Sequence, residues 1–284
     1  MKLRHPGTVP LAFSTLGCPD WCFEKILAQA AGLGYGAVEL RGIRDELETD
    51  AVTLLKKENR SRTRRMLQEA GIGLCSIDCS ASFAEASGFD RSLREGLYAI
   101  EAAAELETPF IRIFGDRIGS QPEEEAADRL IHGIGLLCRA AEGTGVTVLL
   151  ETHGDFQTRS RLTRVVRESL CPQFGLLWDI EHTVRAGERT EEFLRELLPY
   201  VKHVHLKDVD REGRLCLPGD GILNLPATAG LLTAGGYQGY FSLEWEKRWI
   251  PELPEPERAF ARYAELMRRA VGPANGVIPE RREN

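Results

Sequence analysis

The run Val148–Leu149–Leu150–Glu151 has the pattern of a buried strand that ends on a metal-binding side chain. The pattern recurs three times further along the chain, in Leu176–Leu177–Trp178–Asp179, Val201–Lys202–His203–Val204–His205 and Phe241–Ser242–Leu243–Glu244. The closing residues 151, 179, 205 and 244 are 28, 26 and 39 residues apart. A strand, a helix and two loops need roughly that much chain, so the four strand ends are expected to converge around one axis.

The same alternation of β-rich and helical patterns extends along the whole chain. Strands are expected at 10–14, 37–40, 74–77, 110–114, 147–151, 174–179, 201–205 and 240–245. Helices are expected at 23–31, 51–70, 91–106, 123–141, 161–169, 191–198, 226–234 and 255–271. No Gly-x-Gly-x-x-Gly follows the first strand, which favours a closed barrel over an open doubly wound sheet. The sequence therefore predicts an α/β protein with a single (β/α)8 TIM barrel at 1–272 and a polar tail at 273–284.

Composition and charge exclude several classes of protein. The chain has 284 residues and a formal net charge of −7, which argues against a nucleic-acid partner. No apolar run approaches the roughly 18 residues of a membrane span. Seven cysteines are dispersed without a C-x-x-C pair, which predicts unpaired thiols in a reducing compartment. We therefore expect a cytoplasmic protein with a small-molecule substrate and neither a nucleic-acid nor a membrane partner; a homo-oligomer is compatible with the sequence.

Two glutamates, one aspartate and one histidine make an oxygen-rich ligand set with a single imidazole. Such a set suits one divalent ion, with Mn²⁺ as the first choice and Mg²⁺, Co²⁺ or Zn²⁺ as alternatives. A carboxylate that closes a buried strand is costly unless a cation or a donor offsets its charge. A structural ion pair explains any one of these residues equally well, but four of them in consecutive strands favour a shared metal ion.

The longest motifs are Glu151–Thr152–His153–Gly154, Trp178–Asp179–Ile180–Glu181–His182, His203–Val204–His205–Leu206–Lys207–Asp208, Pro218–Gly219–Asp220–Gly221 and Ser242–Leu243–Glu244–Trp245–Glu246. With these motifs almost the whole chain resembles the xylose-isomerase-like sugar-phosphate isomerases and epimerases (AP endonuclease family 2, a TIM-barrel superfamily).

The resemblance implies roles for particular residues. In similar ketose 3-epimerases a Glu, an Asp, a His and a Glu bind one divalent ion, and the two glutamates also move protons. Carried over by motif, these positions are Glu151, Asp179, His205 and Glu244. The resemblance also implies substrate contacts by the histidine of the D-x-x-H motif and by the arginine six positions after the ligand histidine, which are His182 and Arg211.

This chemistry is reasonable on physical grounds as well. A divalent ion on a carbonyl oxygen stabilises the enediolate that forms when the neighbouring carbon loses a proton. A carboxylate on each side can remove that proton and return it. We therefore expect a metal-dependent isomerase or epimerase of a sugar or sugar phosphate, with Glu151 and Glu244 as acid and base. The alternative is a dehydratase on the same barrel, of the inosose or dehydroshikimate type.

Four more residues are candidate substrate contacts. Arg41 and Arg112 lie near strand ends, where a guanidinium either binds a carboxylate or phosphate group or forms an ion pair at the barrel rim. His153 either orients a carboxylate or lines the pocket. Glu246 has the same strand parity as Glu244 and is an alternative ligand.

Two other classes fit less well. Type IV apurinic endonucleases share the D-x-x-H motif but hold three zinc ions with extra histidines at the third and fourth strand ends. Those ends here read Ile77–Asp78–Cys79–Ser80 and Phe114–Gly115–Asp116, without histidine. A barrel that only binds a ligand would not need the complete set of four metal-binding residues.

Overall fold

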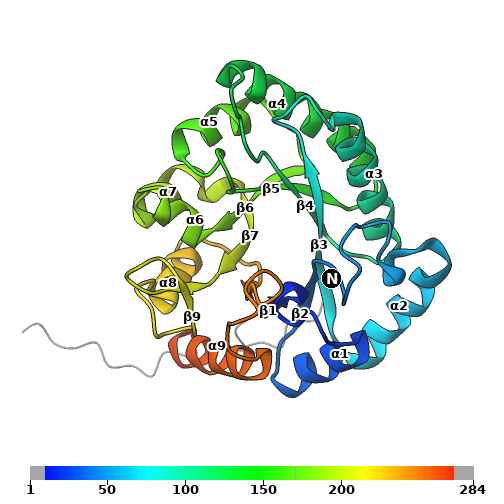
Figure 1. The fold of residues 1–284 in the computed structure, drawn as a ribbon, viewed down its shortest axis with the longest axis vertical. Coiled ribbons are helices and arrows are strands. Elements are labelled where there is room, and N and C mark those ends of the chain that lie inside the picture. Colours follow the sequence, from blue (N-terminus) through cyan, green and yellow to red (C-terminus); the bar gives the residue numbers. More distant parts are fainter. Residues whose placement is uncertain (1–9, 170, 272–284) are drawn as a thin grey trace, which may run out of the picture.

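Eight parallel strands close into a barrel in the order β1-β10-β7-β6-β5-β4-β3-β2, and helices surround it (Figure 1). The computed structural model describes residues 10–169 and 171–271. The barrel strands are β1 (Leu11–Ser14), β2 (Ala37–Leu40), β3 (Gly73–Ser82), β4 (Phe110–Phe114), β5 (Thr147–Glu151), β6 (Phe174–Asp179), β7 (Val201–Leu206) and β10 (Phe241–Leu243). The predicted single (β/α)8 barrel is confirmed, and the predicted tail at 273–284 lies outside the described residues.

The helices that connect the strands are α1 (Phe23–Gly32), α2 (Lys57–Ala70), α3 (Phe89–Glu105), α4 (Glu123–Ala141), α5 (Arg159–Glu168), α6 (Ile180–Arg185), α7 (Thr190–Leu197), α8 (Leu225–Ala234) and α9 (Pro256–Val271). The continuous helix predicted over 51–70 is wrong. Lys56 is extended, with φ −62° and ψ 137°, and separates a short 3-10 turn at Thr53–Leu55 from α2. At the other end of α2, Gly71 takes the left-handed φ of 65° that lets the chain leave the helix.

The last helix covers the first strand and so completes the ring. Phe260 of α9 stacks on Phe13 of β1 with ring centroids 4.1 Å apart, and Tyr35 donates a hydrogen bond to the Phe260 carbonyl over 2.7 Å. Three strands further round the barrel, Trp178 of β6 stacks on Phe193 of α7 with ring centroids 5.3 Å apart. The stacked rings are fully buried between the sheet and the helices, and this burial of apolar surface stabilises the fold.

Strand register brings the predicted ligands to the same level of the barrel. Asp179 of β6 is directly opposite His205 of β7. Glu151 of β5 is opposite the residue two positions before Asp179, and Glu244 lies two positions after the partner of His205. A step of two residues keeps a side chain on the same face of a strand. All four side chains therefore point to the inside, at the carboxyl end of the barrel.

Two elements beyond the predicted ones shape this end. Helix α6 begins directly after β6, and a two-stranded hairpin, β8 (Asp208–Val209) with β9 (Leu215–Cys216), follows β7. Both follow strands that carry predicted ligands, so they contribute to the surroundings of the site.

Cys138 of α4 and Cys171, before β6, are paired in a disulfide. The expectation that all thiols are unpaired is therefore wrong for these two residues, because the fold brings together positions 33 residues apart in sequence. Among the helices of residues 10–169 and 171–271, none combines the length and the apolar character that a membrane crossing requires.

Candidate active site

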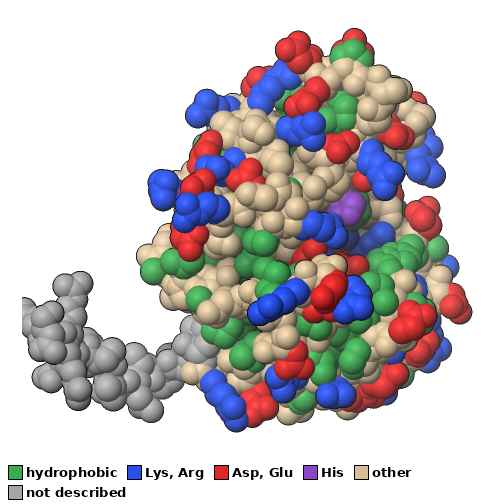
Figure 2. Space-filling view, turned by 60° about the vertical axis from the view of Figure 1, so that its left-hand side comes forward, with side chains coloured by type: hydrophobic (Ala, Val, Ile, Leu, Met, Phe, Trp, Pro, Cys, Tyr) green, Lys and Arg blue, Asp and Glu red, His purple; other side chains and the backbone are tan. Residues whose placement is uncertain are grey.

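A cavity of about 700 Å³ opens at the carboxyl ends of the barrel strands, where barrels of this type place their active sites. Its wall mixes charged, imidazole and apolar side chains: Leu16, Arg41, Arg112, Phe114, Glu151, His153, Glu181, His182, Arg185, Val209, Gly213, Arg214, Leu215, Glu244, Glu246, Trp249, Ile250 and Leu253. Figure 2 shows a hollowed face with histidine and Lys or Arg side chains inside it, the kinds of polar side chain that line this cavity.

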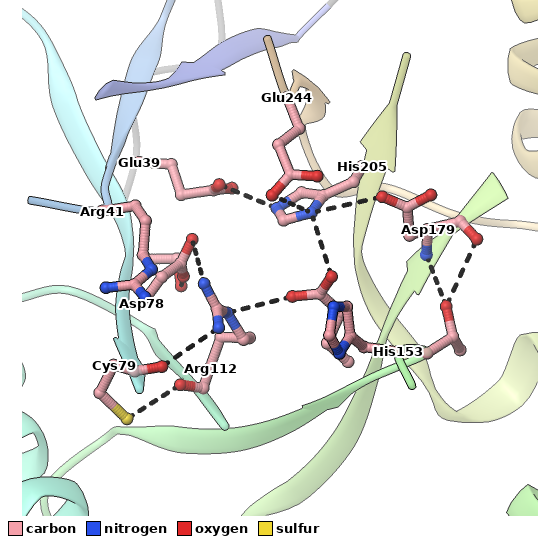
Figure 3. A network of polar contacts seen from close by, with 12 residues as sticks. Glu39, Arg41, Asp78, Cys79, Arg112, His153, Asp179, His205 and Glu244 are labelled. Carbon is pink, nitrogen blue, oxygen red and sulfur yellow. Dashed lines mark hydrogen bonds and ion pairs between the residues drawn. The ribbon is translucent and has the colours of Figure 1, made fainter. Parts of the chain in front are cut away.

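The four predicted ligands lie close together, and two of them, Glu151 and Glu244, line this cavity. Figure 3 shows His205 with Asp179 and Glu244 on either side of it. One ligand atom from each of them lies within 4.8 Å of the others, and all four side chains are buried. His205 is central. Its Nδ1 lies 3.4 Å from Glu244 Oε1, 3.8 Å from Asp179 Oδ2 and 4.0 Å from Glu151 Oε1.

These separations fit a metal ion. Two ligands bound to one ion at about 2.1 Å lie roughly 3.0–3.5 Å apart, so shifts of a few tenths of an ångström would close the set around it. Within the described ranges, the buried Nδ1 of His205 has no hydrogen-bond partner, and the buried Oδ2 of Asp179 has none beyond an ion pair with Lys207 at 3.0 Å. Buried polar atoms are rarely left in this state, so the donor set has the character of a cation site.

Each glutamate turns one carboxylate oxygen toward His205 and the other toward a cation. Oε2 of Glu151 lies 3.1 Å from Nε of Arg112, an ion-pair distance without the alignment of a hydrogen bond. Lys207 donates a hydrogen bond to Oε2 of Glu244 over 2.6 Å. The two cations thereby orient the carboxylates and leave Oε1 of each glutamate directed at the centre.

Glu39 of β2 fixes the orientation of the histidine ligand. Its side chain is fully buried; Oε1 lies 2.8 Å from His205 Nε2 and Oε2 lies 2.6 Å from His203 Nε2. A carboxylate is an acceptor, so each Nε2 carries the proton and donates it. The lone pair of a neutral His205 is therefore on Nδ1, which faces the three carboxylates.

The two glutamates differ in their proton affinity. Burial raises the pKa of Glu151 to about 7 against the opposing charge of Arg112, and the charge of Glu244 adds to the rise. Burial also acts on Glu244, but Lys207 and His205 outweigh it and hold the pKa of Glu244 well below its usual range. Without a bound ion, burial would lower the pKa of His205, yet Glu39 and Glu244 raise it well above its usual value. An ion that takes Nδ1 displaces this proton.

Asp179 contacts His182 as well as the other predicted metal ligands. Its Oδ1 accepts a hydrogen bond from the His182 backbone N–H over 3.1 Å and so caps α6. Nδ1 of His182 donates to the Thr152 carbonyl over 2.9 Å, which leaves Nε2 as the acceptor, 3.3 Å from Lys207 Nζ. Burial lowers the pKa of His182 to about 4, with a further contribution from Lys207, so this imidazole is neutral.

Lys207 is not among the site residues predicted from the sequence. It is 1 % exposed and donates hydrogen bonds of 2.6 Å to both Glu244 and Glu246, with Asp179 Oδ2 3.0 Å away. Burial would lower the pKa of Lys207, but Asp179, Glu244 and Glu246 raise it well above its usual value, so it stays charged. One signal for this role was present, because Lys207 follows the predicted ligand His205 by two residues.

Arg112 and Arg41 lie on the β2–β4 side of the cavity. Arg112 is 1 % exposed, contacts Glu151 and donates to the Cys79 carbonyl over 3.1 Å. Arg41, directly after β2, donates to Ser80 Oγ over 3.0 Å and to the Leu47 carbonyl over 3.4 Å. Both arginines line the cavity, from strands β2 and β4 with β3 between them. Arg112 forms the ion pair that was the alternative to a substrate contact, and the substrate contacts of both arginines stay a prediction.

The other three predicted substrate contacts are placed differently. His153 is partly exposed, lines the cavity and packs against Phe114 with ring centroids 4.6 Å apart. Glu246 lines the cavity too, but its carboxylate pairs with Lys207 and Glu244 is the one that joins the ligand cluster. Arg211 is exposed in the β8–β9 turn and is not among the lining residues, whereas Arg214 of the same hairpin is.

Glu39 is the second site residue that was not predicted from the sequence. The pattern that indicated Glu151, a carboxylate in an apolar strand, is present at Glu39 as well. A carboxylate stands in the apolar run Ala37–Val38–Glu39–Leu40, where it is buried and needs donors. Its donors come from β7 and β10, since Ser242 Oγ also donates to Glu39 over 3.1 Å. These strands are more than 160 residues away in sequence, so the pairing depends on closure of the barrel.

Curated relatives align with about half of this chain or with nearly all of it. An inosose dehydratase of Geobacillus thermodenitrificans is 25 % identical over 302 aligned positions, which cover 94 % of this chain and 97 % of the relative. An inosose dehydratase of Bacillus thuringiensis is 27 % identical over 169 residues, and there the match spans 52 % of this chain and 56 % of the relative.

Solved structures share the fold. A 3-keto-D-glucoside 4-epimerase from E. coli superposes with a TM-score of 0.77 at 16 % identity, over 92 % of this chain and 100 % of that one. A probable 3-DHS dehydratase from Bacillus anthracis superposes at 0.75 and 16 %, over 91 % and 98 %. The IOLI protein with a bound zinc atom superposes at 0.75 and 16 %, over 92 % and 99 %.

The family described as xylose isomerase-like TIM barrel matches residues 27–270, which is most of the chain. The matched region contains the four converging ligands and the residues that orient them, Glu39, Arg112 and Lys207. The chain therefore belongs to the xylose isomerase-like TIM barrel family.

Proposed function

We propose that this protein is a divalent-metal-dependent dehydratase that removes the proton next to the carbonyl group of a polyhydroxylated ketone and then eliminates water. One observation carries the proposal, the convergence of Glu151, Asp179, His205 and Glu244 with their ligand atoms within 4.8 Å of one another. Three buried carboxylates at one point repel each other, and a cation is the simplest means of holding them together.

The four side chains would hold the ion and leave the rest of its coordination sphere for substrate. A divalent ion there would supply positive charge that stabilises the negative charge developing on a substrate oxygen. We infer Mn²⁺, with Mg²⁺, Co²⁺ or Zn²⁺ as alternatives, because an oxygen-rich set with one imidazole accepts all four. The zinc in a structure of the same fold supports a divalent ion in general.

Proton transfer is assigned to Glu151. Its Oε1 faces the centre while Arg112 holds the other oxygen, so a substrate over the centre would lie within reach of this carboxylate. Glu151 takes the proton from the carbon next to the carbonyl and gives it to the hydroxyl group on the following carbon. That group leaves as water, and a carbon–carbon double bond forms beside the carbonyl.

Dehydration is preferred over isomerisation because a relative that is aligned over 94 % of this chain is named an inosose dehydratase. The second candidate is the isomerase or epimerase of a sugar or sugar phosphate that the sequence favoured. Glu244 supports it, since a second carboxylate at the same centre could return the proton from the opposite side. An epimerase of the same fold also supports it.

The proposal includes a small carbohydrate-like substrate and a cytoplasmic location, with neither a nucleic-acid nor a membrane partner. The size of the cavity, about 700 Å³, supports a ligand of one or two rings rather than a polymer. The net charge of −7 also argues against a polyanion.

The test is to load the purified protein with Mn²⁺ in D₂O and add polyhydroxylated cyclic ketones and ketoses. We expect deuterium to appear next to the carbonyl by NMR and an unsaturated product that has lost one water. An epimer without loss of water would support the second candidate. A metal-loaded protein that exchanges no substrate hydrogen in any of these compounds would contradict both.

A further inference from the structure

The lining of the candidate active-site cavity divides into a polar and an apolar part. Arg41, Arg112 and Glu151 lie in or directly after β2, β4 and β5, and His182 lies in α6, which follows β6. Most of the apolar side chains instead lie in segments that follow β1, β7 and β10, and β10 is the neighbour of both other strands in the ring. We call this group the apolar wall. Its members are Leu16, Val209, Leu215, Trp249, Ile250 and Leu253.

Three charged side chains of the same segments have partners of their own. Glu244 and Glu246 each accept a hydrogen bond from Lys207 over 2.6 Å, and Arg214 forms an ion pair with Asp210 at 2.8 Å. These contacts direct the charges toward other residues of the chain. A group that enters this part of the cavity therefore meets mainly apolar side chains.

Trp249 and Ile250 are the exposed part of the apolar wall. Trp249 is 51 % exposed and Ile250 36 %, whereas Leu16, Val209 and Leu253 are buried. A single exposed apolar side chain is common on protein surfaces, but these two continue a buried apolar lining. Covering them with an apolar group would be favourable in proportion to the area removed from water.

A tight turn holds Trp249 in this exposed position. The backbone N–H groups of Trp249 and Ile250 both donate to the Glu246 carbonyl over 3.0 Å, and the N–H of Arg248 donates to the Leu16 carbonyl over 3.2 Å. The indole is therefore held in place by backbone contacts rather than by burial of its ring. A ligand that covered it would not have to order a loop first, which favours binding.

The same turn is connected to the candidate metal centre. The carboxylate of Glu246 accepts from Lys207, and Lys207 also donates to the predicted ligand Glu244. The apolar wall therefore has a defined position relative to the centre, so that the two can contact different parts of one substrate.

The hydroxyl groups of a polyhydroxylated ring are unsuited to the apolar wall. A hydroxyl that leaves water for an apolar surface loses its hydrogen bonds without replacement. The charged and imidazole side chains on the polar side of the cavity supply such partners. A cavity of about 700 Å³ has room for a second group beside one ring. The division of the lining therefore matches a substrate with a polar ring and an apolar substituent.

We propose that the apolar wall is a subsite for an apolar substituent of the substrate, with Trp249 as its main contact. The inference rests on the proposed function and adds a second recognition element to the same cavity. The polyhydroxylated ketone lies over the metal centre, and a ring-sized alkyl or aryl group on the side of the ketone away from the ion lies on the indole. Trp249 thereby decides which substituents are accepted and takes no part in proton transfer.

The experiment compares the methyl and the cyclohexyl ether of scyllo-inosose at the ring position opposite the carbonyl group. Both ethers keep the hydrogen next to the carbonyl and the hydroxyl on the following carbon, which the proposed reaction requires. Hydrogen exchange and release of water are followed by NMR with the Mn²⁺-loaded wild type in D₂O. We expect a KM for the cyclohexyl ether roughly 10- to 100-fold below that of the methyl ether, because more apolar surface leaves water.

Tryptophan fluorescence measures the same contact without turnover. Acrylamide should quench chiefly Trp249, because Trp21, Trp178 and Trp245 are at most 5 % exposed. With the Mg²⁺-loaded wild type, the cyclohexyl ether should lower this quenching more than the methyl ether does. Trp249→Phe should lack the quenchable component, which assigns the signal. The comparison of the two ethers needs no variant and so does not depend on how a variant folds.

Variants then assign the preference to the apolar wall. Trp249→Ala should reduce the ratio of the two KM values to near one, and Trp249→Phe should keep part of it. Leu97→Ala is the control, because it removes an exposed apolar side chain of α3 that does not line the cavity, and it should keep the full ratio. A merely structural role of Trp249 would change both KM values together and leave their ratio as it is.

The outcomes separate the subsite from the proposed function. Exchange of both ethers with equal KM values and equal quenching would overturn the subsite and leave the proposed function standing. An undiminished ratio in Trp249→Ala would overturn the assignment to the apolar wall. Shielding of Trp249 from acrylamide before any ether is added would mean that a second copy of the chain covers it, which also overturns the subsite. Protection of Trp249 by the cyclohexyl ether, without hydrogen exchange in either ether, would support the subsite and contradict the proposed function.

Discussion

Oε1 of Glu39 lies 2.8 Å from Nε2 of His205, on the side of the imidazole away from the three carboxylates. The other oxygen of this carboxylate, Oε2, accepts a hydrogen bond from Nε2 of His203 over 2.6 Å. Glu39 therefore acts as the common acceptor below the candidate metal centre. Its effect on the reaction would pass through the ligand histidine, which makes it a positioning residue.

Replacing Glu39 by Gln should weaken metal binding roughly 10- to 100-fold, as loss of the partner of a ligand histidine does. The amide offers one acceptor oxygen where two imidazole N–H groups need one each. Titration of the metal-free protein with Mn²⁺ measures the change, and circular dichroism checks the fold. Ser242→Ala is the matched control, because it removes only the third donor to Glu39, at 3.1 Å. Equal affinities of Glu39→Gln and the wild type would contradict this role.

Loading the metal should stabilise the fold by mass action, because the folded chain alone gathers the four ligands. At an ion concentration of 100 times Kd the gain is about 2.7 kcal/mol, and a chelator should reverse it. Thermal unfolding with and without Mn²⁺ measures it. His205→Ala should lose at least an order of magnitude in metal affinity and most of the stabilisation. His132→Ala, a histidine of α4 that stacks on Phe89, should keep both. Unchanged metal content of dialysed His205→Ala would point to a different site.

Glu151→Gln should reduce exchange of the substrate α-hydrogen by roughly 10²- to 10⁴-fold, the usual contribution of a positioned acid or base, whereas Glu244→Gln should do so only under the second candidate, in which both glutamates move protons. Both amides keep an oxygen that can bind the ion, so metal binding should suffer less than exchange. NMR in D₂O and metal titration on the same samples separate the two effects. Retained exchange in Glu151→Gln would contradict its role as the base, and loss of exchange in both variants would support the second candidate, the two-glutamate mechanism.

Gly154→Ala should destabilise the loop that follows β5 more than an ordinary Gly→Ala change at positive φ. Gly154 has a φ of +59°, and an added Cβ would lie 2.8 Å from the Asp116 carbonyl oxygen. Gly119 has a φ of +66° and nothing within 4 Å of its added Cβ, so Gly119→Ala isolates the backbone strain, about 1 kcal/mol. Urea unfolding of both variants gives the difference, and equal losses would show that the close approach to Asp116 is unimportant.

The barrel strands and the four ligands at their ends can be predicted from local sequence patterns. Parallel strands covered on both faces are apolar along their whole length, so the run ending at Glu151 is recognisable from local sequence. The same local pattern locates Asp179, His205 and Glu244. Their convergence then follows from the geometry of a closed barrel, which sets the carboxyl ends of all strands on one face.

The residues that orient these ligands depend on contacts that local sequence does not reveal. Glu39 meets His205 across 166 positions, and the match requires the actual stagger of β2 against β7. The position of Arg211, which the sequence predicts as a substrate contact, also depends on contacts that local sequence does not reveal. Asp210 accepts hydrogen bonds from the backbone N–H groups of Glu212 and Arg214, which sets the shape of the β8–β9 turn, and Arg214 rather than Arg211 lines the cavity.

Lys207 competes with a metal ion for the same carboxylates, since its Nζ lies 3.0 Å from Asp179 Oδ2 and 2.6 Å from Glu244 Oε2. Lys207→Met should therefore lower the thermal stability of the metal-free protein, because the buried carboxylates lose their cation. It should at the same time raise the affinity for Mn²⁺, and the ion should restore the lost stability. Lys202→Met is the matched control, an exposed lysine of the same strand that donates only to the Pro199 carbonyl in the described structure. Weaker Mn²⁺ binding by Lys207→Met than by Lys202→Met would mean that the lysine organises the ligands more than it competes with the ion.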